Sequence, residues 1–206
     1  MKTNGTGGAE TSKTGLSFEK QTDLAYKIQQ DLKNKYQLVA IPIKSKVGAF
    51  SVIRISDQTK VGILTKQMGF YDVLAILNKQ SQINNINDIS NIQNINSKKW
   101  KPDEVFFNLE KNTVFIVEKK WQKEAGSVDE KLLGFGNKRR LYQNIFNQSA
   151  KEPKVSVQFC ALFNRAWWLD GNRGKNEKTY QDYFDTLRMD GIKIFFDNYE
   201  YWWFGL

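Results

Sequence analysis

The sequence contains no histidine and a single cysteine, Cys160, among its 206 residues. Without histidine, the chain cannot form Ser–His or Cys–His nucleophile pairs, nor zinc sites that combine cysteine with histidine. One cysteine also excludes an internal disulfide, which favours a reducing, cytoplasmic location. Any hydrolytic chemistry must therefore rest on Asp, Glu, Lys and Tyr side chains together with a hard cation.

Long apolar runs are also absent. No stretch approaches the roughly 18 apolar residues of a transmembrane helix, and the first residues lack the apolar core of a signal peptide. The 31 Lys and Arg residues outnumber the 22 Asp and Glu residues, which gives a net charge of +9. This balance favours a polyanionic partner, such as nucleic acid or a membrane surface.

The composition predicts one globular domain with a short arm. It is 40% hydrophobic and 14% aromatic, which is typical of a folded chain. Residues 1–15 are rich in Gly, Thr and Lys without apolar periodicity, and we expect a flexible arm there. Residues 16–206 form the predicted domain. Within it, residues 80–99 are biased towards Ile and Asn, and we expect a partly ordered loop or insertion there.

Apolar periodicity predicts alternating helices and strands. Before the central hairpin we expect a helix over 16–36, extended chain over 37–55 interrupted by Pro42, a short strand or turn over 62–66, and a helix over 70–78. After it we expect a turn over 126–131, a helix over 138–148, a strand over 154–163, a helix over 179–189 and a strand over 192–196. This order predicts an α/β domain with a central mixed β-sheet flanked by helices. The aromatic tail, residues 199–206, either closes the core or forms a dimer surface.

The chain between these two groups of elements predicts a β-hairpin. Two runs rich in Val, Ile, Phe and Thr, Glu104–Leu109 and Thr113–Trp121, flank the polar residues 110–112. Asp103 stands at the mouth of the first strand. Near the end of the second strand, Glu118 and Lys120 are two residues apart and share a face, whereas Lys119 points the other way.

Two carboxylates and an ammonium are therefore expected to converge at one end of the hairpin. Carboxylate oxygens can hold Mg²⁺, which polarises a phosphoryl oxygen and lowers the pKa of a bound water. A lysine beside that water can orient it and stabilise developing charge. This set suits phosphodiester hydrolysis. The alternative is a surface hairpin with a solvated, charged end.

The same residues resemble a known family. Pro102-Asp103 followed by Glu118-Lys119-Lys120 is similar to the PD-(D/E)XK nuclease signature, and Gln122 with residues 126–131 resembles a segment that follows this motif in some type II restriction endonucleases. The resemblance implies a restriction-endonuclease-like core, with Asp103 and Glu118 as metal ligands and Lys120 as the residue that orients or activates water. In several members a glutamate of the first helix joins the metal site. Glu19 matches that position, although a carboxylate in a first helical turn also compensates the helix dipole.

Candidate DNA-binding residues follow the motif. Gln122 shares a strand face with Lys120, so we expect it to contact the water or the DNA. Lys138, Arg139 and Arg140 lie in the first turn of a predicted helix, where cations interact unfavourably with the helix macrodipole. Their presence there would be explained by contact with phosphates, or by an ordinary solvated helix face. Tyr142, four residues after Lys138, completes a pair that resembles a secondary support in related nucleases.

A second candidate segment is the loop over 164–178. It combines Trp167 and Trp168 with Arg173 and other cations, which suits base stacking and phosphate contact. The alternative is that the tryptophans cap the core beneath a basic loop.

The leading hypothesis is a Mg²⁺-dependent type II restriction endonuclease that cuts double-stranded DNA at a specific sequence, with no membrane partner. Cleavage of a palindrome would favour a two-fold homodimer. The residues themselves indicate only metal-dependent phosphodiester hydrolysis on a basic scaffold, and restriction is implied by the resemblance. A repair or recombination nuclease, such as a junction resolvase, and a non-catalytic DNA-binding module are the alternatives.

Overall fold

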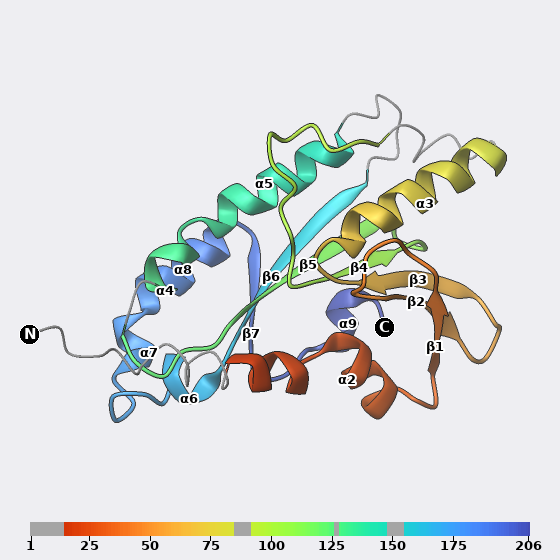
Figure 1. The fold of residues 1–206 in the computed structure, drawn as a ribbon. Coiled ribbons are helices and arrows are strands. Elements are labelled where there is room, and N and C mark those ends of the chain that lie inside the picture. Colours follow the sequence, from red (N-terminus) through yellow and green to blue (C-terminus); the bar gives the residue numbers. More distant parts are fainter. Residues whose placement is uncertain (1–14, 85–91, 126–127, 148–154) are drawn as a thin grey trace, which may run out of the picture.

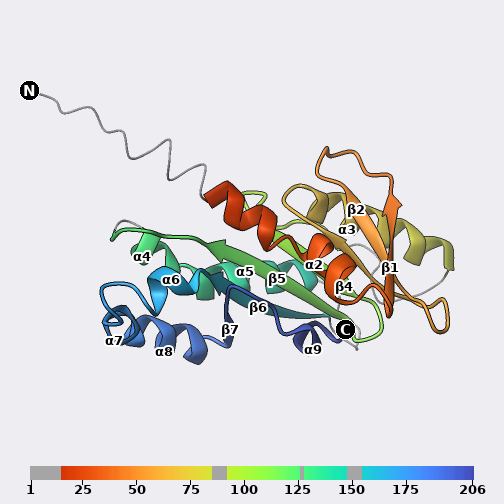
Figure 2. The same cartoon turned by 90° about the horizontal axis from the view of Figure 1, so that it is seen from below.

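In the part of the chain that the computed structural model describes (residues 15–84, 92–125, 128–147 and 155–206), seven strands form one mixed sheet in chain order. Figures 1 and 2 show β1 at one edge and β7 towards the other. The strands are β1 (Tyr36–Ile41), β2 (Ala49–Arg54), β3 (Lys60–Thr65), β4 (Glu104–Asn108), β5 (Thr113–Lys120), β6 (Ser156–Phe163) and β7 (Ile192–Phe196). The predicted α/β class with a mixed sheet is confirmed.

Helices connect and cover these strands. They are α2 (Leu24–Asp31), α3 (Gly69–Asn84), α4 (Val128–Leu132), α5 (Phe135–Phe146), α6 (Arg165–Trp168), α7 (Asn176–Thr179), α8 (Gln181–Met189) and α9 (Tyr201–Phe204), and residues 15–21 are also helical. Across the described ranges, no helix has both the length and the apolar character needed to cross a membrane.

The sheet changes direction at β5. Strands β1 to β5 pair antiparallel with their neighbours, whereas β5, β6 and β7 run parallel. The β4–β5 hairpin has the predicted strands, each shorter by one residue at its end, with Glu104 opposite Val117 and Asn108 opposite Thr113. Its turn is closed by Asn108, whose side-chain oxygen accepts the Lys111 N–H at 2.9 Å. Because β5 is central, its end is enclosed by elements on both faces.

Each face of the sheet carries its own apolar core. Helices α3, α5 and α8 pack on one face, together with side chains such as Val105 and Ile116. Helices α2 and α9 pack on the other, with Phe106 and Val117. Figure 1 shows α3 and α5 along one side of the sheet and α2 along the opposite side. The alternation along β5 therefore assigns Glu118 and Lys120 to the α5 face and Lys119 to the α2 face.

The predicted helix over 16–36 is interrupted, and that expectation was wrong in its continuity. Helical residues 15–21 end at Thr22, and α2 begins at Leu24 with Asp23 as its cap, which accepts the Tyr26 N–H at 2.9 Å. The Thr22 carbonyl accepts hydrogen bonds from Lys119 Nζ at 2.8 Å and Tyr199 Oη at 2.9 Å. Tertiary partners from β5 and the chain terminus thus take the carbonyl that a continuous helix would use.

Three further expectations need correction. Helix α5 begins at Phe135 rather than 138, and α4 occupies part of the predicted turn over 126–131, of which 126–127 lie outside the described residues. Helix α3 continues to Asn84, inside the Ile/Asn-rich segment. Further along that segment Ile92 is buried beside α3, where the Asn78 amide donates to the Ile92 carbonyl at 2.6 Å. Residues 85–91 of that segment, and 1–14 of the predicted arm, lie outside the described ranges.

The aromatic segments near the C-terminus complete the two cores. Trp168 is fully buried and packs against Phe163 and Tyr180, which matches the core-capping alternative for the loop over 164–178. In the tail, Phe204 is fully buried in the α2-face core, so the tail closes that core. Trp202 remains exposed, and a dimer surface there stays a prediction.

Candidate active site

Asp103, Glu118 and Lys120 meet at one end of the hairpin. The Lys119 backbone N–H donates to Asp103 Oδ2 at 2.7 Å, which fixes the carboxylate beside the end of β5. Lys120 Nζ lies 3.4 Å from Glu118 Oε2 and 3.9 Å from Asp103 Oδ2. The placement follows from local rules, since Asp103 precedes β4 at the point opposite Glu118, and Glu118 and Lys120 share a strand face.

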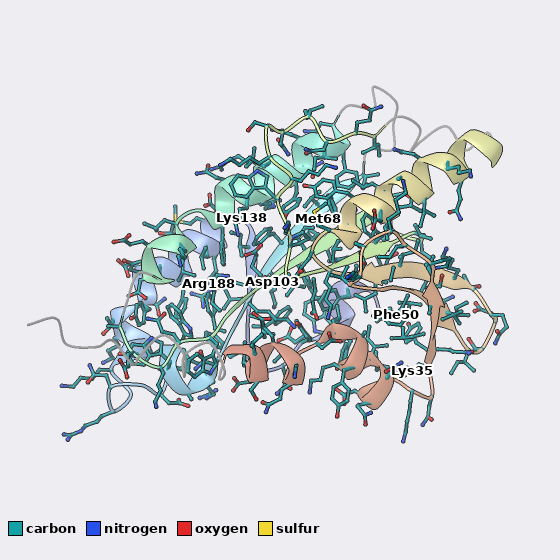
Figure 3. The ribbon with its side chains drawn as sticks, in the orientation of Figure 1. Lys35, Phe50, Met68, Asp103, Lys138 and Arg188 are labelled. Carbon is teal, nitrogen blue, oxygen red and sulfur yellow. The ribbon has the colours of Figure 1, made fainter. Side chains whose placement is uncertain are left out.

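Helix α5 adds a second ammonium to this group. Lys138 Nζ donates to Glu118 Oε2 at 2.8 Å, closer than Lys120 does. Figure 3 labels Asp103 and Lys138, which come from the start of the hairpin and from α5. The buried Phe135 ring lies under both cations, 5.3 Å from Lys120 Nζ and 5.6 Å from Lys138 Nζ. The ring attracts both ammonium groups and helps to hold them beside the carboxylates.

Glu118 is a buried acid, and we call its oxygen Oε1 the open oxygen because it is buried and accepts no hydrogen bond from the described residues. Its side chain is 3% exposed, and burial, together with the negative charge of Asp103, raises its pKa, while Lys120 and Lys138 oppose that rise. Within the described residues, Glu118 Oε1 and the Tyr142 hydroxyl are both buried without a hydrogen-bond partner. Burial raises the pKa of Tyr142, and the nearby Glu118 charge raises it further.

This open oxygen fits a hard divalent cation. A buried carboxylate oxygen without a donor is unfavourable unless an ion or water meets it, and Glu118 lies beside a second carboxylate, Asp103. In the described part of the chain, no group of three or more His, Cys, Asp or Glu side chains is close enough to hold a metal ion. Asp103 and Glu118 supply two carboxylates, and Mg²⁺ commonly binds through one or two carboxylates with waters as its other ligands.

A family model described as PD-(D/E)XK nuclease superfamily domain matches residues 46–153, slightly more than half of the 206-residue chain. The chain belongs to the PD-(D/E)XK nuclease superfamily. The matched residues include Asp103, Glu118, Lys120 and Lys138, so the grouping described above falls inside the superfamily domain. Comparisons with curated proteins and with solved structures gave no match.

Glu19 lies outside the matched PD-(D/E)XK residues but next to the site. It lines a cavity of about 70 Å³ together with Asp103 and five other residues, namely Asp23, Lys66, Gln67, Glu104 and Lys119. Its side chain is exposed, so the carboxylate is free to turn towards solvent or towards this cavity. Its participation in a metal site stays a prediction.

On the opposite face of the PD-(D/E)XK hairpin lies a buried ion pair that sequence reasoning did not find. Lys119 Nζ is 3.0 Å from Glu104 Oε1, and the two side chains are 3% and 5% exposed. The ammonium also donates to the carbonyls of Thr22 at 2.8 Å and Glu19 at 3.2 Å, and Tyr199 donates to Glu104 Oε2 at 3.0 Å. The Glu104–Lys119 pair therefore holds the helical segment 15–21, which includes Glu19, against the α2 face of the hairpin.

A sequence signal for this pair existed. Glu104 and Lys119 are opposite charges in apolar strands, and the hairpin register places them on one face as near-diagonal neighbours. Phe135 gave no comparable signal, because its position under the two lysines depends on where α5 begins and how it docks.

Two predicted DNA contacts are buried. Gln122 donates through its amide to the Glu124 carbonyl at 2.7 Å and to Asp129 Oδ1 at 3.0 Å, and it exchanges two hydrogen bonds with Asn164. Tyr142 is 1% exposed. Gln122 links the ends of β5 and β6, and Tyr142 lies close enough to Glu118 to feel its charge. Contact of either residue with DNA stays a prediction.

The three basic residues of α5, Lys138, Arg139 and Arg140, point to three different surroundings. Lys138 faces Glu118, and Arg139 Nη1 donates to the Asp190 carbonyl at 2.9 Å, so Arg139 ties α5 to the end of α8. Arg140 is the exposed member, with a side chain 65% exposed. Arg173 is also exposed, in a left-handed backbone conformation between α6 and α7. Contact with DNA stays a prediction for all four of these residues.

Proposed function

We propose that this protein is a Mg²⁺-dependent endodeoxyribonuclease that hydrolyses double-stranded DNA at a specific sequence, as a homodimeric type II restriction endonuclease does. The observation that carries the proposal is the buried Glu118 carboxylate, with its open oxygen, beside Asp103 and two lysines. Membership of the superfamily supports nuclease chemistry and DNA as substrate. Sequence specificity is supported only by the resemblance of Gln122 and residues 126–131 to restriction endonucleases.

Each residue has a physical role in this proposal. Asp103 and Glu118 would hold the cation, which supplies charge neutralisation at the phosphate and activation of water. Asp103 is held in place by the Lys119 N–H, so little reorganisation is needed on binding. Lys120 reaches both carboxylates and can turn its ammonium to orient the attacking water or stabilise charge on the phosphate. Lys138 keeps a positive charge next to Glu118, which favours the ionised form that binds metal.

The test of sequence specificity is digestion of a sequenced phage genome with the protein and Mg²⁺, followed by sequencing of the fragment ends. A restriction endonuclease should give one recurring sequence at the ends. Ends that share no sequence but gather at branched or damaged DNA would support the repair-nuclease alternative. Intact DNA would contradict both and favour a non-catalytic binding module.

Binding to DNA is expected to weaken steeply with salt. The net charge is +9, and each phosphate contact contributes about −0.9 to the slope of log affinity against log salt. Replacing exposed Arg140 or Arg173 by alanine should reduce the magnitude of that slope by about 1 for each phosphate that the side chain neutralises. The measurement is fluorescence anisotropy of a labelled duplex in Ca²⁺ over a salt series. A slope near zero for the wild type would exclude a DNA partner held by phosphate contacts.

A further inference from the structure

A larger hollow lies on the α2 face of the sheet, next to the small cavity that Asp103 lines. It has a volume of about 270 Å³ and lies between α2 and the strands β2 and β3. It shares Asp23, Lys66 and Glu104 with the small cavity that Asp103 lines, so the two spaces are neighbours with common walls. Figure 3 labels Asp103, which lines the small cavity, and Phe50, which lines the larger hollow. We call the larger hollow the α2 pocket.

The α2 pocket is lined by aromatic rings and by charged side chains that each have a partner of opposite charge. Tyr26, from α2, and Phe50, from β2, contribute the rings, and Tyr26 is 52% exposed although it is large and aromatic. Of the charged residues that line the pocket, Lys66 pairs with Asp23 at 3.3 Å and Glu104 pairs with Lys119 at 3.0 Å. A phosphate would find no uncompensated cation there, whereas an uncharged, flat, polar group could stack on the rings.

Hydrogen-bonding side chains that line the α2 pocket indicate which class of flat ligand it fits. The Gln29 side chain and the Lys66 ammonium line the pocket and can offer donors and acceptors to a ring edge. A nucleobase combines a stacking face with such an edge. The neighbouring site with Asp103 would hold the phosphate of the same strand, so base and phosphate would lie in adjoining spaces, as they do in one nucleotide.

We propose that the α2 pocket binds one unpaired nucleobase of the strand being cut, next to the phosphate that is hydrolysed. This inference rests on the proposed function and specifies the form of its substrate. A base inside a duplex cannot enter the pocket, because it is stacked and paired, so the target nucleotide must be extruded or already single-stranded. Stacking on a protein aromatic ring is then expected to strengthen binding by about tenfold.

The experiment is an abasic scan of a bound duplex. A short duplex that binds the protein in Ca²⁺ is prepared with one base removed at each position in turn, and affinity is measured by anisotropy for the wild type, Tyr26→Ala and Tyr26→Phe. For each protein, the affinity for the abasic duplex is compared with the affinity for the intact duplex. At one position, this loss of affinity should be about ten times larger for the wild type than for Tyr26→Ala. Tyr26→Phe keeps the ring and should resemble the wild type. Trp202→Ala, which removes an exposed aromatic side chain of α9 outside the pocket, is the matched control.

The outcomes separate this inference from the proposed function. If Mg²⁺ supports cleavage but Tyr26→Ala and the wild type respond identically at every position, the pocket does not bind a base, and the nuclease proposal stands. If one position couples to Tyr26 but no DNA is cut, the pocket is supported and the nuclease proposal fails. Absence of binding to any duplex would contradict both. Circular dichroism of the variants establishes that each is folded.

Discussion

Replacing Asp103 by asparagine is expected to lower the rate of DNA cleavage by about 10³-fold, which corresponds to roughly 4 kcal/mol of lost transition-state stabilisation. The substitution keeps the shape of the side chain and removes its negative charge, so the cation would lose one of two protein carboxylates. Asp103 is half-buried and sits before β4, so the fold should tolerate the change. Single-turnover nicking of supercoiled plasmid in Mg²⁺ measures the rate.

A matched control is Asp185→Asn. Asp185 is an exposed carboxylate on α8, and its partners are the neighbouring Arg188 at 2.8 Å and Gln181 at 2.9 Å. That variant should cleave like the wild type, and both variants should bind DNA, since neither change removes a cation. Cleavage by Asp103→Asn at a rate near that of the wild type would mean that the metal site lies elsewhere.

Replacing Lys119 by methionine is expected to lower the free energy of unfolding by about 3 kcal/mol or more. The change leaves the Glu104 carboxylate buried without its cation, and it removes the donor to the Thr22 and Glu19 carbonyls. Burial already raises the pKa of Glu104, and Lys119 opposes that rise. Urea denaturation followed by circular dichroism gives the free energy. Arg188→Met, which breaks an exposed ion pair at 2.8 Å, should cost less than about 1 kcal/mol.

A double variant tests the reason for this loss of stability. If the cost comes mainly from an unpaired buried charge, Lys119→Met combined with Glu104→Gln should be more stable than Lys119→Met alone, because neither charge remains. A Lys119→Met protein as stable as Arg188→Met would show that the buried pair contributes little to folding.

The β4–β5 hairpin and the grouping of Asp103, Glu118 and Lys120 at its end could be predicted, because both depend only on residues near one another in sequence. Strand alternation placed Glu118 and Lys120 on one face and Lys119 on the other, and the short polar turn brought Asp103 to the same end. The resemblance to PD-(D/E)XK nucleases rested on this same segment, and the match over residues 46–153 confirmed it.

Other features depend on contacts between distant parts of the chain. At the helix break Asp23 is a local N-cap residue, but the Thr22 carbonyl accepts hydrogen bonds from Lys119 and Tyr199, which are far away in sequence and could not be paired with it from local patterns. Lys138 was predicted to contact phosphate or to lie on an ordinary solvated face, and its hydrogen bond to Glu118 depends on how α5 docks on the sheet. Apolar periodicity predicted that a helix exists there without fixing its first residue, and the register of a helix against a sheet is set by packing. Mg²⁺, the homodimer and sequence-specific cleavage remain proposals.

The decisive measurement for the two-carboxylate metal site is the metal dependence of plasmid cleavage by the wild type and by Asp103→Asn. We expect cutting with Mg²⁺ or Mn²⁺ and none in EDTA. With Ca²⁺ we expect tight binding and little cutting, because Ca²⁺ can neutralise the two carboxylates but takes more ligands at longer distances and positions water poorly. Asp103→Asn should show little cutting with any of these ions. Equal cleavage by the wild type in EDTA and in Mg²⁺ would contradict this mechanism, because Asp103 and Glu118 would then not be ligands of a catalytic metal.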